Sequence, residues 1–160
     1  MNAADVMTTG AATVRPDTPL AQALMLLVEH RISGLPVVDA NELLVGLISE
    51  SDFLRPKEGR KPRLLEFLAN DGTRAASELA ALKVEDLMTT NAISVAVDTP
   101  VDEIVELMNR HAVRRLPVAT EGKVVGIVSR SNLIQALLRR AQATPGPAGK
   151  LGARPPKRHT

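Results

Sequence analysis

Apolar residues along the chain fall into two series that have the same order. Residues 20–28 place leucine, alanine and valine three and four positions apart, which predicts a helix. Two short apolar runs follow, at 35–39 and 44–49, and each predicts a strand. With a short strand near residues 13–15 and a closing helix after the second run, the pattern predicts a β-α-β-β-α unit. The same series begins again at residues 101–108, so the unit is expected twice.

The two series align as an internal repeat. Residues 5–39 match residues 86–120 at a constant spacing of 81, and fourteen of these 35 positions are identical. After one residue is lost in a turn, the spacing becomes 80 and holds through the second apolar run. Chance does not produce such a match, so the chain consists of two copies of one structural unit. Threonine is expected to cap the first helix of each unit and serine the last, at Thr18, Thr99, Ser51 and Ser131.

Two further segments lie outside the repeats. Residues 56–83 form an insertion, in which two short helices are expected at 64–68 and 75–82. The segment from residue 144 is rich in proline and glycine, which predicts a disordered tail. The expected organisation is therefore repeat 1 at residues 1–55, the insertion at 56–83, repeat 2 at 84–143 and the basic tail at 144–160.

Composition and charge exclude several classes of protein. The 160 residues contain no cysteine and no apolar run near the ~20 residues of a membrane helix, so we expect a cytoplasmic protein without disulfides or thiolate–zinc sites. Six basic residues and no acidic one follow residue 138, which leaves 14 basic against 18 acidic residues before it. The basic character therefore belongs to the tail. Two phenylalanines and no other aromatic residue argue against a stacking platform for single-stranded nucleic acid.

The sequence shows no catalytic or metal-binding pattern. His30 and His111 stand at equivalent helix ends, where a cation or a hydrogen-bond donor stabilises the last backbone carbonyls. Neither has a carboxylate at metal-ligand spacing. No nucleophile–base pair stands out, and the Gly-x-Ser-x-Gly elbow is missing. We therefore expect neither a metal site nor an enzyme.

The polar residues that close the second apolar run of each copy are the best candidates for binding chemistry. They end the stretches 46–52 and 126–132. A strand that leads into a helix leaves outward N–H groups that favour an anion. Serine hydroxyls can donate to phosphate oxygens, and the carboxylate of Asp52 can accept from two vicinal sugar hydroxyls. The alternative is an ordinary capped strand–helix corner.

Four motifs occur in order in each copy. Met-Thr-Thr heads the copy, Leu-Pro-Val stands in its middle, and Gly-x-x-Ser-x-Ser followed by Asp or Asn ends it. Together they resemble the CBS domain family, and two tandem copies resemble one CBS pair, also called a Bateman module. The resemblance covers residues 5–55 and 84–140. It implies an α+β fold of two β-α-β-β-α repeats packed with pseudo-two-fold symmetry, and a regulatory module that binds adenosine-containing ligands in the clefts between repeats.

The resemblance also implies roles for individual residues. Asp52 would bind the ribose hydroxyls, and Ser49 and Ser51 would face phosphate oxygens. The adenine would lie between residues of the same copy, namely Ile32, Leu35, Pro36, Thr8 and Thr9. The second copy offers the corresponding residues Val113, Leu116, Pro117, Thr89, Thr90, Ser129 and Ser131.

The second copy departs from the motif at Asn132. An amide can accept from a hydroxyl but lacks the charge and one acceptor arm, so a weaker ribose site is expected there. The same copy carries a basic cluster at Arg114, Arg115 and Arg130, which favours phosphate. Our hypothesis is an asymmetric pair of clefts, one reading ribose and the other charged for phosphates. The alternative for the arginines is a solvated basic face.

The expected function is that of a non-catalytic sensor. AMP, ADP, ATP, NAD or S-adenosylmethionine, with or without magnesium, would shift the two halves relative to each other and so control an unidentified partner protein. The apolar helix faces predict a homodimer. The alternative is a scaffold that binds nucleic acid or another polyanion through the tail and residues 57–63, with weak and salt-sensitive affinity.

Overall fold

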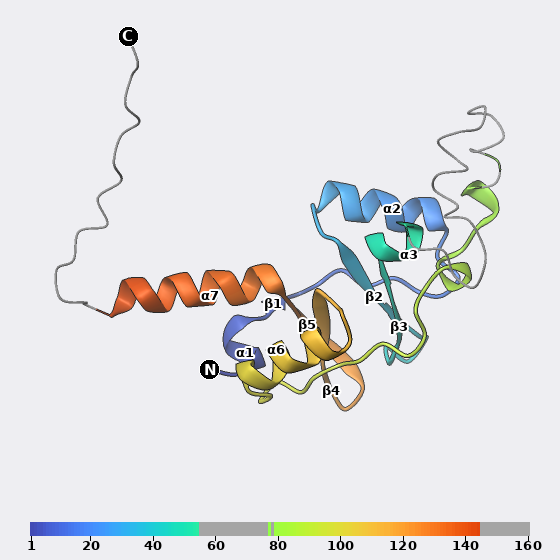
Figure 1. Ribbon diagram of the computed structural model, residues 1–160. Helices are drawn as coiled ribbons and strands as arrows, with labels where there is room; N and C mark the ends of the chain where they lie inside the picture. Colours follow the sequence, from blue (N-terminus) through green and yellow to red (C-terminus); the bar gives the residue numbers. More distant parts are fainter. Residues whose placement is uncertain (55–76, 78, 145–160) are drawn as a thin grey trace, which may run out of the picture.

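The structure, a computed structural model, describes residues 1–54, 77 and 79–144 (Figure 1). The first repeat contributes α1 (Ala3–Val6), β1 (Thr8–Thr9), α2 (Leu20–Glu29), β2 (Gly34–Val38), β3 (Leu44–Ser49) and α3 (Glu50–Leu54). The second contributes a 3-10 helix η1 (Val84–Asp86), α6 (Val101–Arg110), β4 (Arg115–Thr120), β5 (Lys123–Ser129) and α7 (Arg130–Ala143). This order confirms the predicted α+β class with two tandem repeats.

Each repeat is built on an antiparallel hairpin with equivalent register. Gly34 pairs with Ser49 across β2 and β3, and Arg115 pairs with Ser129 across β4 and β5. The strand expected near residues 13–15 is reduced to a single parallel bridge between Val14 and Val37. Three residues of extended chain at a strand edge form too few ladder bonds to extend the sheet.

Two apolar cores lie beneath the two hairpins. In the first, Leu20 and Leu27 of α2 pack against Leu35 and Ile48, and all four are buried. In the second, Ile104 and Met108 of α6 take the equivalent places against β4 and β5. The helical spacing in the sequence therefore predicted most of each buried face, but Val28 of α2 and Val105 of α6, which share that spacing, are exposed.

The segment that leads into each repeat packs on the other repeat. Thr8 and Thr9 of β1 pair with Ile127 and Gly126 of β5, so the second sheet has the order β1-β5-β4. Ala3 and Val6 of α1 lie in the second core. The reciprocal exchange places Val84 in the first core and bridges Thr89 to Leu47. Each half therefore completes the other, and neither core is made by one repeat alone.

The predicted helix caps differ from the observed ones. Thr18 accepts a hydrogen bond from the N–H of Arg15 at 2.9 Å, and Pro19 stands at the N-cap of α2. The cap of the last helix of the second copy lies two residues earlier than predicted, at Ser129 rather than Ser131. Likewise α3 begins at Glu50, so Ser51 lies inside the first turn. The prediction of a threonine cap was wrong because the Thr18 hydroxyl accepts a hydrogen bond within the preceding Pro-Asp-Thr turn instead of from the helix.

The first helix expected in the insertion lies outside the described residues. Of the second, Ser77 and residues 79–81 are helical. Leu79 and Leu82 pack against the first core. In the described part of the chain, no helix has both the length and the apolar character needed to cross a membrane.

Candidate functional site

A cleft with a volume of about 430 Å³ lies between the two repeats. The first repeat supplies the segment after β1 and the loop between α2 and β2, and the second supplies β4, β5 and the start of α7. We call it the Asn132 cleft. Its lining consists of Thr8, Gly10, Ala11, Ala12, His30, Arg31, Ile32, Ser33, Gly34, Arg115, Ile127, Ser129, Ser131 and Asn132. Its volume suits a ligand of nucleotide size.

The threonines and the residues that end the serine motifs pair across the repeats. The amide of Asn132 donates to the hydroxyl oxygen of Thr8 over 3.2 Å. The hydroxyl of Thr89 donates to Asp52 over 2.9 Å. Membership of the same copy predicts that Thr8 lies near Asp52 and Thr89 near Asn132. The structure corrects this grouping, because each leading segment crosses to the other repeat.

Asp52 belongs to the start of α3 and is buried, with 9% of its surface exposed. Its Oδ2 accepts from the backbone N–H of Ser49 at 2.8 Å and faces the Ser49 hydroxyl at 3.4 Å. Its Oδ1 accepts from Thr89. The carboxylate therefore accepts from the backbone N–H three residues before it, as the acidic residue of a capping box does, and it also accepts a hydroxyl hydrogen from the other repeat. It does not line the Asn132 cleft.

Asn132 repeats this capping arrangement with an amide. Its Oδ1 accepts from the N–H and the hydroxyl of Ser129, each over 2.8 Å. A backbone N–H can only donate, so the oxygen must lie on that side and the NH2 group on the side of Thr8. We expected the amide to accept from a ribose hydroxyl. The structure corrects this expectation, because the oxygen is committed to the helix cap.

Arg115 extends along the junction of the two repeats. Its side chain lies over Gly34, the equivalent residue of the first repeat, where an added Cβ would stand 2.7 Å from Cδ of Arg115. Its guanidinium donates to the Ser33 hydroxyl. Burial lowers the pKa of Arg115 below its ordinary value, and the nearby carboxylate of Glu50 opposes that shift in part. A buried guanidinium therefore borders the cleft.

The remaining predicted site residues fall into three sets. Those that line the Asn132 cleft with Asn132 itself are Thr8, Ile32, Arg115, Ser129 and Ser131. Those buried in the strands, which do not line it, are Leu35, Pro36, Ser49, Leu116 and Pro117. Five others are exposed and also lie outside the lining: Thr9, Ser51, Thr90, Arg114 and Arg130. Val113 is half-buried and lies outside the lining too.

Several residues that line the cleft belong to no sequence motif and were not predicted. Arg31 and His30 follow the end of α2, and residues 10–12 form the segment after β1. One signal was available in the alignment, because Arg31 corresponds to Ala112 at the spacing of 81. Both positions have positive φ, +50° and +53°, so the same turn presents a cation in one copy and a methyl group in the other.

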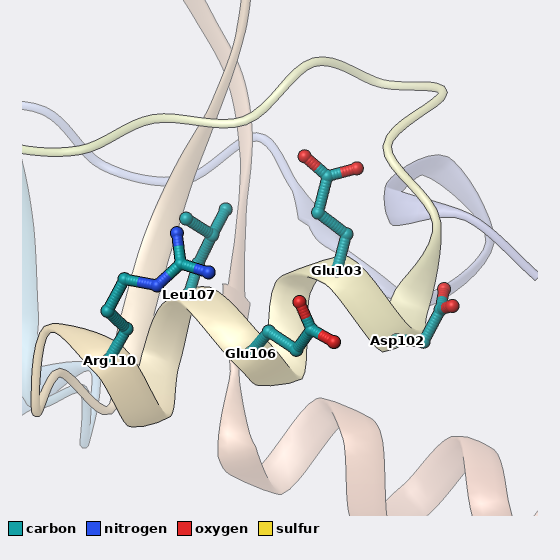
Figure 2. A pocket seen from close by; sticks show the side chains of 5 residues that line it. All are labelled: Asp102, Glu103, Glu106, Leu107 and Arg110. Atoms are coloured by element: carbon teal, nitrogen blue, oxygen red, sulfur yellow. The ribbon is translucent and has the colours of Figure 1, made fainter.

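A second hollow of about 350 Å³ runs along α6 and contains none of the predicted residues. Figure 2 shows its lining, which comes from one helix: Asp102, Glu103, Glu106, Leu107 and Arg110. Its three carboxylates are exposed to solvent. Among the described residues, no group of three or more His, Cys, Asp or Glu side chains is placed to hold a metal ion.

Comparison with known proteins gives the same assignment to both halves. The model of the CBS domain matches residues 3–58 and again residues 84–139. The CBS domain-containing protein CBSX1 of Arabidopsis thaliana, a chloroplastic protein, is 35% identical over 139 residues, which are 79% of this chain and 58% of that protein. The chain therefore spans about three fifths of the length of this relative.

Solved structures agree with the fold. The crystal structure of CBSX2 in complex with AMP is 34% identical, has a TM-score of 0.68, and is covered over 98% of its length by 88% of this chain. A further structure of CBSX2 from Arabidopsis thaliana is 32% identical with a TM-score of 0.73, over 89% of this chain and 98% of that one. With two matched repeats, two hairpin cores and a cleft between them, the chain belongs to the CBS domain family as a CBS pair.

Proposed function

We propose that the protein is a non-catalytic regulatory module that binds an adenosine-containing ligand in the Asn132 cleft. The observation that supports this best is the origin of the cleft walls. Ile32 and the segment after β1 come from the first repeat, and Ile127, Ser129 and Asn132 come from the second. A ligand that contacts both walls favours the arrangement of the repeats that fits it.

The polar and apolar residues of the cleft suit the parts of a nucleotide. Ile32, Ile127 and the alanines at 11 and 12 offer aliphatic contacts for a planar base. Arg31, Arg115 and the serine hydroxyls offer donors for phosphate oxygens. The related CBSX2 structure contains AMP. We therefore propose AMP as the first ligand to test, followed by ADP, ATP, NAD and S-adenosylmethionine with and without magnesium.

Thermal unfolding tests this proposal directly. A ligand present at about 100 times its Kd stabilises the native state by about 2.7 kcal/mol. For a chain of this size, the corresponding rise in Tm is on the order of 5 °C. At least one adenine nucleotide is expected to produce this rise. A panel in which none of them changes Tm would contradict the proposal.

Filling the cleft provides the matched test. Ala11 is half-buried and lines the Asn132 cleft. Ala11→Phe is expected to weaken binding there by about tenfold or more, because the ring occupies the space of the ligand. The control is Ala92→Phe, the equivalent position of the second repeat, which does not line this cleft. Isothermal titration calorimetry with AMP compares the two, and equal loss in both variants would contradict the assignment of the cleft.

The proposal includes a homodimer. Large apolar side chains on α7 are exposed, with 60% of Ile134, 68% of Leu137 and 55% of Leu138 accessible to solvent. This helix projects beyond the two hairpins in Figure 1. A second copy would cover the same face on both partners. Leu137→Glu is expected to convert a dimer to a monomer in light scattering, while Glu106→Gln on the exposed face of α6 leaves the mass unchanged.

The alternative function, polyanion binding through the tail and residues 57–63, rests on segments outside the described residues. It differs from the sensor in its test. Deleting residues 144–160 leaves nucleotide affinity unchanged if the protein is a sensor and removes polyanion binding if it is a scaffold. The comparisons with CBS pairs favour the sensor.

A further inference from the structure

Asn132 presents a hydrogen-bond donor where the equivalent residue of the other repeat presents an acceptor. Its oxygen accepts from the N–H and the hydroxyl of Ser129, and its NH2 group donates to Thr8. At the equivalent place, Asp52 accepts the hydroxyl hydrogen of Thr89. The hydrogen bond between the threonine and the capping residue therefore has its donor and acceptor exchanged between the two halves of the molecule.

This reversal changes which ligand group each residue can recognise. The vicinal hydroxyls of a ribose can both donate to a carboxylate, in charge-assisted bonds. Against the NH2 group of Asn132 they can only accept, and one of its two hydrogens already points to Thr8. One neutral bond remains, which is roughly half as strong as a charge-assisted one.

The other polar groups of the Asn132 cleft are also mainly donors. Arg31 and Arg115 contribute guanidinium groups, which only donate, and Ser131 contributes a hydroxyl, which can donate as well as accept. None of the fourteen described residues that line the cleft is an aspartate or a glutamate. Glu50 and Asp52 act on Arg115 from outside the lining, and the donors that line the cleft suit an oxyanion, because phosphate oxygens accept from each of them.

We infer that the Asn132 cleft selects its ligand by an anionic group such as a phosphate and does not discriminate ribose from 2′-deoxyribose, and that Asn132 determines this selectivity. The inference rests on the proposed function, because it concerns the ligand of the same cleft. It identifies the ligand class as nucleotides with a free phosphate, deoxyribonucleotides included.

Titration with AMP, 2′-deoxy-AMP and adenosine tests the inference. The amide signals of Gly10 and Ala11 in ¹H–¹⁵N spectra report on this cleft, since both residues line it. The Kd of 2′-deoxy-AMP is expected to lie within about fivefold of that of AMP, because a single neutral bond is at stake. Adenosine is expected to bind about tenfold more weakly or worse, since it lacks the charged group.

Asn132→Asp provides the reciprocal test. The variant restores the residue found at the equivalent position, where the chain already accommodates the same capping arrangement. It is expected to increase the preference for AMP over 2′-deoxy-AMP about tenfold, because a carboxylate accepts from the 2′-hydroxyl. Asp52→Asn, which alters a residue outside this cleft, is the control and is expected to leave the ratio at Gly10 and Ala11 unchanged.

The outcomes distinguish failure of the inference from failure of the proposed function. If AMP shifts the two signals but 2′-deoxy-AMP binds more than fivefold more weakly, the inference is wrong and the proposed function stands. Adenosine binding as tightly as AMP, or an Asn132→Asp variant with an unchanged ratio, contradicts the inference in the same way. If no nucleotide shifts Gly10 or Ala11, the proposed function fails, and the inference fails with it.

Discussion

Replacing Gly126 with alanine is expected to lower the free energy of unfolding by about 2 kcal/mol, because the added methyl group has no room. A Cβ at this position would stand 2.7 Å from Sδ of Met7 and 2.8 Å from the carbonyl oxygen of Thr8. That oxygen belongs to the backbone of β1, so relief requires β1 to move away from β5. Urea unfolding followed by circular dichroism measures the change.

Two glycine variants serve as the comparison. Gly46→Ala meets the carbonyl oxygen of Thr89 at 2.8 Å in the reciprocal crossing, so it is expected to destabilise the protein by a similar amount. Gly10 has no heavy atom within 4 Å of an added Cβ, although its φ is +65°. Gly10→Ala therefore carries only the cost of a left-handed backbone, about 1 kcal/mol. Losses at Gly126 and Gly46 no larger than the loss at Gly10 would contradict the steric account.

Replacing Arg115 with methionine is expected to weaken AMP binding in the Asn132 cleft by about tenfold or more, without loss of stability. Binding weakens because a guanidinium that borders the cleft is removed. Stability is retained because burial, the largest influence, lowers the pKa of this arginine, and this cost of burying the charge outweighs its attraction to Glu50 and Asp52. Methionine keeps much of the packed volume over Gly34.

Arg114→Met is the matched control, since its side chain is exposed and does not line the cleft. Calorimetry with AMP and urea unfolding are measured on both variants. The control is expected to change neither quantity appreciably. An Arg115→Met protein that binds AMP normally, or that unfolds at clearly lower urea than the control, would contradict the role given to Arg115.

The repeat in the sequence was sufficient to predict the two units, with a hairpin and a packed helix in each, but not the exchange of the leading segments. Leucines at helical spacing in residues 20–28 identified the face of α2 that packs on the first core. The identical Leu-Pro-Val triplets predicted β2 and β4, in which Leu35 and Leu116 are buried. Periodicity is a local property of the sequence, so it can be recognised without any knowledge of which segments meet in space.

The walls of the site were predicted less completely. The serine motif indicated a strand–helix corner in each copy, and the corner of the second copy, with Ser129 and Asn132, borders the Asn132 cleft, whereas Ser49 and Asp52 of the first do not. It did not indicate that Thr8 would meet Asn132 rather than Asp52. An internal alignment shows which residues are equivalent, but it does not show which copy each segment packs against.

The amino-acid sequence by itself determined the two copies, their strands and helices, and the chemical types available at each motif. Only the tertiary structure decided that the leading segments exchange between the repeats and that the oxygen of Asn132 turns to the helix cap. Both outcomes depend on long-range packing and on satisfying backbone donors, which no local pattern records. They decide which functional groups face the cleft, and therefore what the protein can bind.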